Sequence, residues 1–578
     1  MNKFYLFLIT ILMYTFANGQ QIKQIANINP GSASSYYENY RTAISKNGIL
    51  YFSAGSAATG VELWKYDGTT VTLVKDINPG VGNANCHSFF LLNDKFIFVA
   101  NNGTNGFEWW TSDGTPEGTT MIKDASPGGA SGVFQSSSLT AQNYFQDNNI
   151  LYYCGATGGN FELWKTDGTE AGTVLVKNIL SDDLFVASSY PEYFAKFKGQ
   201  IYFKCLLGLW KTNGTTAGTV SVKSGITPAD LFNNNDKYLL FVDIDSGPDL
   251  WKSDGTTAGT IKIKTLKSTN RNWFGNRFSL VGSNVLFPGD DGGAAGDELW
   301  KTDGTASGTV LVKDLWPGSS GAAPQNTVVV NNKLYYKGDN GSTGFEFYVS
   351  DGTEAGTKLV KELNPGTRSG FSLPTEIITD GKKIYMGGGR DFKIQLWVSD
   401  GTETGTTEIV INPGGESNPL GLYKFGNKLF FFGNSEALGY EPYVVTFTNE
   451  LVDEDNDGYN SNTDCNDFNP AINPGATEIP NNGIDEDCNG ADLISSTSDP
   501  VSDKISIYPN PATDVISITN DNPGDFTISV LTSSGLKIAE LYNPSTINVS
   551  DYKEGVYIFQ CVMSNNKITR FKKIIITH

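Results

Sequence analysis

A short pattern of alternating apolar and polar residues recurs along most of the chain. Three of its copies are ELWKYDGTTVTLVKDINPG (62–80), ELWKTDGTEAGTVLVKNI (162–179) and ELWKTDGTASGTVLVKDLWPG (298–318). Within each copy, apolar or aromatic residues occupy every second position of two runs, which predicts two β-strands that each bury one face. Asp-Gly separates the runs and predicts a tight turn, because glycine adopts positive φ without steric cost.

One aromatic residue marks the same position of every copy, and its spacing gives the period of the repeat. From the first copy to the truncated ninth, eight steps give a period of about 47 residues, which is typical of repeated supersecondary units. An apolar segment such as Leu50–Phe52 precedes the ELW run, and a weaker strand follows the Pro-Gly turn. Four strands in such a length match one β-propeller blade. The anchor residues are Trp64, Trp110, Trp164, Trp210, Trp251, Trp300, Tyr348, Trp397 and Tyr443.

The two ends of the repeat array are complementary halves of one unit. Residues 21–31 resemble the LVKDINPG half, whereas residues 439–445 carry only the ELW half. The N-terminal segment therefore supplies the strand that the last blade lacks, which closes a ring and removes exposed sheet edges. We predict an all-β protein whose residues 20–447 form a large propeller of about eight or nine four-stranded blades.

At these residues the chain resembles a family of secreted proteins named for its ELWxxDGT repeats, and more distantly kelch-type blades. The resemblance implies the propeller fold and a secreted context, but it implies no settled activity. Within the repeat, Gly208 and Gln395 replace the glutamate, and Tyr348 replaces the tryptophan.

Composition narrows the functions that such a ring can have. The chain has only two histidines, His87 and the terminal His578, which argues against histidine-dependent catalysis and histidine-ligated zinc. Its formal net charge is −20, so nucleic acid is not an expected partner.

The N-terminus has the pattern of a secretion signal. Lys3 precedes an apolar run from Phe4 to Phe16, and small residues at Ala17 and Gly19 offer a cleavage site. The run is too short to span a bilayer comfortably, so we assign residues 1–19 to a signal peptide and expect no membrane span.

Residues 452–495 carry eleven carboxylates and neither lysine nor arginine, and we interpret them as a metal-binding module. Oxygen ligands at alternate positions, with Gly458 at a sharp turn, have the spacing of an EF-hand-type loop and favour calcium. Cys465 and Cys488 each follow a predicted ligand, and we expect a disulfide between them to staple the two loops. The predicted ligands are Asp453, Asp455, Asp457, Tyr459, Ser461 and Asp464 in the first loop, and Asp485, Asp487, Asn489 and Asp492 in the second.

This stretch resembles a metal-binding motif family of secreted bacterial proteins, since it contains D-x-D-x-D-G-Y, D-C-N-D, P-G-A-x-E and N-G-x-D-x-D-C-x-G. The flanking helices of a true EF-hand are absent, because three prolines interrupt the segment between the loops. The alternative interpretation is a solvated acidic linker.

The last part of the chain contains alternating strands after a polar linker at 496–502. Residues 503–578 are predicted to form a β-sandwich. The pattern Tyr508-Pro-Asn-Pro511, Gly535, Gly555-Val-Tyr557 and Lys572-Lys-Ile574 resembles the type A C-terminal sorting domain of type IX secretion. The resemblance implies export by the type IX secretion machinery of Bacteroidota-like bacteria, to the medium or the outer cell surface. A plain binding module is the alternative.

Two classes of function remain, and we favour a non-enzymatic binding or adhesion protein with an extracellular glycan or protein ligand. The alternative is a secreted propeller enzyme that acts on glycans through paired carboxylates, either as a hydrolase or as a lyase. The repeated tryptophans and glutamates are interpreted as packing and structural residues, and the lysines of ELWK and LVK as a solvated strand face. No catalytic residue is assigned. Asp290, Asp291 and Asp297 occur in one unit only and are interpreted as solvated residues of a glycine-rich loop.

Overall fold

The computed structural model divides the chain into two compact units, Met1–Pro470 and Ala471–His578. The predicted signal peptide, residues 1–19, lies outside the described residues except for a two-residue strand. The structure describes residues 14–15, 20–36, 43–134, 143–180, 188–244, 248–267, 277–371, 376–390, 393–413, 415–435, 438–447, 453, 455, 457–460, 463–466, 469–479, 484–489, 505–520, 525–532, 537–563 and 569–577.

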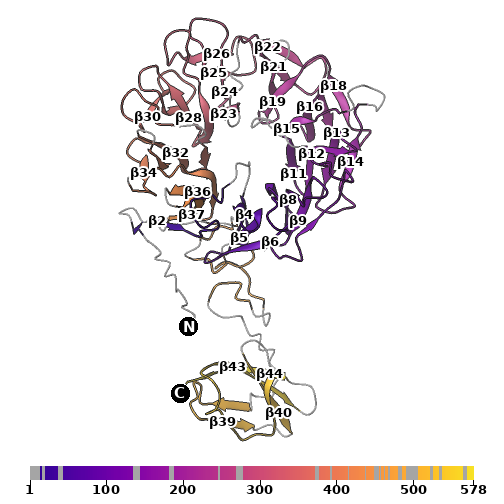
Figure 1. The fold of residues 1–578 in the computed structure, drawn as a ribbon, viewed down its shortest axis with the longest axis vertical. Coiled ribbons are helices and arrows are strands. Elements are labelled where there is room, and N and C mark those ends of the chain that lie inside the picture. The colour runs from indigo at the N-terminus through magenta and orange to yellow at the C-terminus, as the bar shows by residue number, and fades with distance from the viewer. Residues whose placement is uncertain are drawn as a thin grey trace. The chain divides into compact units, whose positions relative to one another are not determined.

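The first unit is a β-propeller whose described residues form nine antiparallel sheets, eight of four strands and one of five. Figure 1 shows the sheets arranged as blades around a ring, with the first strand of each blade towards the centre. Each blade is a meander, because consecutive strands are hydrogen-bonded neighbours. The fold class is therefore the predicted one, and the blade count is the upper of the two expected values.

The blades follow one another in chain order, and each contains one complete or composite copy of the repeat. Blades 1 to 3 comprise β3 (Ala43–Lys46), β4 (Ile49–Ser56), β5 (Gly60–Tyr66), β6 (Val71–Lys75), β7 (His87–Leu92), β8 (Lys95–Asn101), β9 (Phe107–Ser112), β10 (Thr120–Met121), β11 (Tyr144–Asp147), β12 (Ile150–Thr157), β13 (Asn160–Thr166) and β14 (Val174–Lys177). Blades 4 to 6 comprise β15 (Glu192–Phe197), β16 (Gln200–Cys205), β17 (Gly208–Thr212), β18 (Val220–Lys223), β19 (Pro228–Asn233), β20 (Leu239–Asp243), β21 (Asp249–Ser253), β22 (Ile261–Lys264), β23 (Ser279–Val281), β24 (Asn284–Gly289), β25 (Glu298–Thr302) and β26 (Val310–Lys313). Blades 7 to 9 comprise β27 (Gln325–Val330), β28 (Lys333–Asp339), β29 (Phe345–Ser350), β30 (Lys358–Lys361), β31 (Ile377–Thr379), β32 (Ile384–Arg390), β33 (Lys393–Ser399), β34 (Thr407–Ile409), β35 (Leu420–Phe425), β36 (Lys428–Ser435) and β37 (Gly439–Phe447), to which β2 (Gln20–Gln24) and β1 (Tyr14–Thr15) are added.

The N-terminal segment closes the ring, as its sequence predicts. Strand β2 pairs antiparallel with β37, in a register that places Gln20 opposite Phe447 and Gln24 opposite Tyr443. Beyond β2, the backbone N–H of Ile28 donates to Glu441 of the last blade at 2.9 Å. Blade 9 is therefore assembled from both ends of the repeat array.

Apolar side chains between neighbouring blades hold the ring together. A separate buried cluster lies at each of the nine junctions, including the junction of blade 9 with blade 1. The anchor tryptophans belong to this packing: Trp110 is only 7% exposed, and its Nε1 donates to the Ala100 carbonyl at 3.2 Å. The burial supports the packing interpretation of these residues over exposed platforms for sugars.

The repeated glutamate of ELW is a buried acceptor for backbone N–H groups of the turn that leads to the next blade. In blade 1, Glu62 is fully buried and accepts the N–H of Ile77 at 2.6 Å and of Ala84 at 3.2 Å. We call this arrangement the carboxylate clamp; it satisfies amides that burial would otherwise leave unpaired. It recurs at Glu108, Glu162, Glu298, Glu346 and Glu441.

The repeated lysines do not form the solvated face that we expected. Lys65 Nζ donates to the Gly114 carbonyl of the next blade at 3.1 Å, and Lys75 Nζ donates to the Thr119 carbonyl at 2.7 Å. Each long side chain therefore crosses a blade junction and ends on the DGT turn of its neighbour. The same bonds recur between Lys165 and Gly214, Lys252 and Gly304, Lys301 and Gly352, Lys123 and Thr173, and Lys313 and Thr357.

The clamps predict a stability that decreases as the pH rises. Burial raises the pKa of Glu62 and of Glu346 to about 8, although backbone N–H donors oppose the shift. Because the folded pKa lies above the ordinary value of 4.5, the stabilisation is fully present below that value and is lost as the pH rises towards 8. Thermal unfolding followed by circular dichroism without calcium should show a midpoint that falls between pH 5 and pH 9.

A neutral side chain at the clamp provides the control for this pH dependence. Glu62→Gln cannot ionise, so its midpoint should fall less steeply over the same pH range. A wild-type midpoint that rises over this range would contradict the protonated clamp.

The second unit contains the predicted β-sandwich. One of its sheets has the order β38–β39–β42, formed by β38 (Ile505–Tyr508), β39 (Val515–Asn520) and β42 (Thr546–Asn548). The other has the order β41–β40–β43–β44, formed by β40 (Phe526–Thr532), β41 (Lys537–Tyr542), β43 (Gly555–Met563) and β44 (Thr569–Ile576). A separate apolar cluster that includes Ile516, Ile528, Val530 and Phe559 fills the space between the sheets. Within the described ranges, no helix is long and apolar enough to cross a membrane.

Candidate metal centre

The first acidic loop brings three of the predicted ligands together. Ligand oxygens of Asp453, Asp455 and Asp457 all lie within 4.8 Å of one another. The Asp453 carboxylate orders the turn, since its two oxygens accept the N–H of Asp457 at 3.1 Å and of Gly458 at 2.9 Å. Gly458 has φ of +96°, a conformation that glycine adopts without strain, so the sequence prediction of a sharp turn at this residue is correct.

The oxygens at the centre of this loop are suited to a cation. Both carboxylate oxygens of Asp455 and the Oδ2 of Asp457 are buried and have no hydrogen-bond partner among the described residues. Burial, followed by the neighbouring Asp457 carboxylate, raises the pKa of Asp455. Unpaired carboxylates at such separations repel one another, and a bound cation would remove the repulsion. The residues present therefore fit a metal ion.

The second acidic loop forms another cluster of three carboxylate side chains. Ligand oxygens of Glu478, Asp485 and Asp487 lie within 4.8 Å of one another. The N–H of Asp487 donates to Glu478 Oε2 at 3.0 Å, and the N–H of Asn489 donates to Asp485 Oδ1 at 3.0 Å. Glu478 is missing from the ligands that we predicted, although it is the glutamate of the P-G-A-x-E motif. Its distance along the chain from the loop placed it outside the alternating pattern.

The remaining predicted ligands lie outside these two carboxylate clusters or outside the described residues. Asp464 is only 8% exposed, and its Oδ1 accepts the N–H of Asn466 at 2.7 Å. The N–H of Tyr459 donates to Asp457 Oδ1 at 2.9 Å. Ser461 and Asp492 lie outside the described residues.

Five of the six cysteines of the chain fall into two groups. Cys465 and Cys488 form the predicted disulfide, so neither offers a thiolate to a metal. Cys86, Cys154 and Cys205 are free and buried in the propeller. Burial raises the pKa of the Cys205 thiol to about 12, which makes it an inert apolar side chain at neutral pH.

Comparison with known families supports both C-terminal assignments. Residues 464–492 match a family described as "Putative metal-binding motif", of the copper-binding MopE type. Residues 506–577 match the secretion system C-terminal sorting domain. The chain is a secreted or cell-surface protein, as its sequence predicts, and the sorting domain implies recognition by the type IX secretion machinery. Neither match is to a catalytic family, and the metal itself is not identified.

Comparisons with whole proteins give weaker likenesses. No curated protein sequence matches the chain. PorZ, an essential surface component of the type IX secretion system of Porphyromonas gingivalis, is 11% identical with a TM-score of 0.33 over 97% of this chain and 81% of that one. A GH74 enzyme of Niastella koreensis is 10% identical with a TM-score of 0.31 over 95% and 93% of the two chains. These identities and TM-scores are too low to indicate a function for this protein.

Proposed function

We propose that this protein is a non-enzymatic binding or adhesion protein of the cell exterior, with a calcium-stabilised module. Residues 20–447 form the binding ring, 452–495 hold the metal, 496–502 are a linker and 503–578 direct export. A ring closed by its own N-terminal strand is a rigid frame, and its irregular loops offer surface for an extracellular ligand.

The main support for a non-enzymatic function is that the repeated carboxylates are bonded to the protein's own backbone. The six clamp glutamates are buried and bonded to backbone amides, so none of them faces a substrate. The aspartates of the DGT turns are also committed: Asp113 Oδ1 accepts the N–H of Thr115 at 2.9 Å. A hydroxyl bond from Thr115, followed by that N–H, lowers the pKa of Asp113, which leaves it ionised. A glycosidase needs two carboxyl groups that flank a bond of the substrate, and these residues cannot supply them.

Calcium is the ion that best suits the acidic module. The two carboxylate groups offer oxygen only, there is no histidine within 452–495, and both cysteines of the module are in a disulfide. Hard oxygen ligands of this kind favour calcium over copper or zinc. Asp453, Asp455 and Asp457 would hold one ion, and Glu478, Asp485 and Asp487 would contribute to a second site. The ion would supply charge neutralisation and local order.

Removing one charged ligand should weaken calcium binding. Asp455→Ala deletes the carboxylate whose two oxygens have no partner among the described residues, so affinity should fall by about tenfold or more. Calorimetric titration of the full secreted chain with calcium measures this change. Asp94→Asn, which changes an exposed carboxylate in a propeller turn, should leave the titration unaltered. A wild-type chain that releases no heat at millimolar calcium, with the disulfide intact, would refute the assignment.

The export assignment predicts a clear loss of secretion. A chain that lacks residues 503–578 should accumulate in the periplasm with a folded ring, because the sandwich has its own apolar core. Immunoblots of periplasmic and extracellular fractions measure this result, and mass spectrometry should place the cleavage of the wild-type chain within 495–503. Undiminished secretion of the truncated chain would contradict it.

The binding function can be tested with the secreted protein itself. Labelled protein should bind specifically to some member of an array that carries both glycans and extracellular proteins. Binding to no member above the level of a heat-denatured sample would count against the proposal.

A further inference from the structure

At the junction between blades 4 and 5, the clamp position has no side chain at all. Gly208 stands at the clamp position of blade 4, paired with Cys205, just as Glu62 is paired with Ala54 in blade 1. Only Leu206 and Leu207 join β16 to β17, whereas residues 55–61 separate the equivalent pair in blade 1. A Cβ atom at Gly208 would lie 2.1 Å from the Lys223 carbonyl oxygen, so this backbone cannot accommodate a side chain there.

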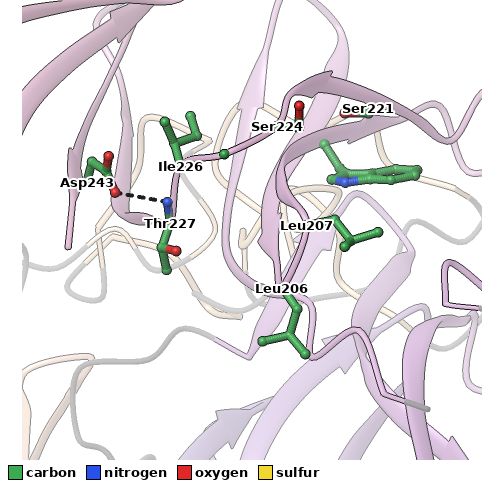
Figure 2. Close-up of a pocket in the computed structure, with 9 residues that line it drawn as sticks. Leu206, Leu207, Ser221, Ser224, Ile226, Thr227 and Asp243 are labelled. Carbon is green, nitrogen blue, oxygen red and sulfur yellow. Dashed lines mark hydrogen bonds between the residues drawn. The ribbon is translucent and has the colours of Figure 1, made fainter. Parts of the chain in front are cut away.

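A cavity of about 660 Å³ opens where the clamp and the longer hairpin are missing. Figure 2 shows the cavity between two parts of the ring. The shortened hairpin with Leu206 and Leu207 lies on one side of the cavity, and Ile226, Thr227 and Asp243 lie on the other. Such a volume is in the range that holds small ligands. The lining residues are Leu206, Leu207, Trp210, Ser221, Ser224, Gly225, Ile226, Thr227 and Asp243.

The cavity lies beside backbone N–H donors of a kind that the clamp glutamate accepts at other junctions. Ile226 is a buried core residue of this junction, as Ile77 is at the first one, and the N–H of Ile77 donates to the clamp glutamate. The N–H groups of Gly225 and Ile226 have no acceptor within the described part of the chain. The Nε1 of Trp210 also lacks a partner among these residues, but so do those of Trp164, Trp251 and Trp300, so this feature is not specific to the cavity. Gly225 is exposed, so water can accept its N–H, whereas Ile226 is only 7% exposed. A buried amide without an acceptor is costly, and a ligand oxygen would satisfy that of Ile226.

A carboxylate lies next to these donors. Asp243, which takes the position of Ala54 in blade 1, is 1% exposed, and its Oδ1 accepts the N–H of Thr227 at 2.9 Å. Figure 2 shows this bond beside Ile226. No lysine or arginine lines the cavity, so Asp243 would repel a ligand carboxylate or phosphate. The cavity therefore favours a neutral ligand that offers both an acceptor and a donor.

The remaining lining residues are apolar groups and hydroxyls. Leu206 and Leu207 are 47% and 44% exposed at the tip of a two-residue turn, where polar residues or glycine are the norm. Ser221 and Ser224 add hydroxyls that can donate and accept. A ligand with an apolar face and several hydroxyl groups would match both features.

We propose that this cavity binds the acetamido group and sugar ring of a neutral N-acetylated amino sugar at the end of a glycan. The acetamido carbonyl accepts from the N–H of Ile226, and the acetamido N–H donates to Asp243. The methyl group and the apolar face of the ring contact the leucines and the indole, while the sugar hydroxyls contact the serines. This inference rests on the proposed binding function, to which it adds a site and a ligand class.

Matched probes test the acetamido group directly. Calorimetric titrations of the full secreted chain would use N,N′-diacetylchitobiose, cellobiose, which has the same linkage but no acetamido groups, and N-acetyl-leucine amide as a peptide-like probe. We expect binding of N,N′-diacetylchitobiose with an affinity at least about tenfold above those of the other two. Equal binding of cellobiose, preference for the peptide-like probe, or binding of none would each overturn the assignment.

Variants locate the site on the ring. Leu206→Ser removes an exposed apolar contact and should weaken N,N′-diacetylchitobiose binding by about fivefold or more. Ser224→Trp, at an exposed lining residue, should fill the cavity and abolish binding. The control Leu175→Ser changes a leucine of similar exposure, 44%, on blade 3 and should leave the affinity unchanged. If N,N′-diacetylchitobiose binds but Leu206→Ser and Ser224→Trp have no effect, the binding function stands and the site is wrong.

Discussion

Deleting residues 20–31 is expected to unfold most of the ring, although these residues lie at one end of the repeat array. The deletion removes β2 from blade 9 and leaves the edge of β37 unpaired. It also removes three buried isoleucines, Ile22, Ile25 and Ile28. At about 1.5–3 kcal/mol for each buried side chain, the loss is roughly 5 kcal/mol or more, which is comparable with the whole stability of many domains.

Thermal unfolding of the chain that begins at residue 32 measures this effect. The truncated protein should show a midpoint many degrees below that of the chain that begins at residue 20, or no cooperative transition. Gln21→Ala, at an exposed position of the same strand, should change stability by less than about 0.5 kcal/mol. An unchanged midpoint after the deletion would show that β2 is not needed for closure.

Glu346→Ala is expected to be the most damaging single substitution that we name. Glu346 is fully buried and accepts the N–H of Leu363 at 2.5 Å and of Asn364 at 3.4 Å. Alanine would leave these amides unpaired beside a new cavity, so the free energy of unfolding should fall by about 2–4 kcal/mol. Denaturant titration of the purified chain provides the measurement.

A natural variant of the repeat supplies the control for this substitution. Gln395 occupies the same position in blade 8, and its Oε1 accepts the N–H of Ile411 at 3.0 Å. Glu346→Gln keeps an acceptor of the same shape, so near pH 6 it should cost less than about 1 kcal/mol. If glutamine proved as harmful as alanine, the bonds from the backbone N–H groups to the side-chain oxygen would not be the stabilising feature.

The sequence was sufficient to predict the ring but not the contacts that connect its blades. The repeat and its complementary ends lead directly to four-stranded blades and closure by β2. The contact of Lys65 with the Gly114 carbonyl could not be predicted, because it joins residues of different repeats whose separation depends on how the blades pack. A lysine beside a strand is usually solvated, and only the position of the neighbouring DGT turn reverses that expectation.

In the acidic module and at the cavity, too, the sequence predicted local features but not contacts between residues that are distant along the chain. Alternating carboxylates with Gly458 predicted the first loop, because the three carboxylates that come together there lie within a few residues. Glu478 joins the second loop from outside the alternating pattern, which is why the pattern did not include it. The sequence showed Gly208 as a departure from the repeat. It could not show the cavity that results, because the unpaired amide of Ile226 belongs to the turn that follows the next strand.

The ring is expected to bind its extracellular ligand without converting it. The most direct measurement is mass spectrometry of glycans captured by the full secreted chain after long incubation with calcium. The captured glycans should be recovered with unchanged mass, and no fragments should appear in the supernatant. Fragments that carry an added water, or the unsaturated ends that a lyase leaves, would contradict it.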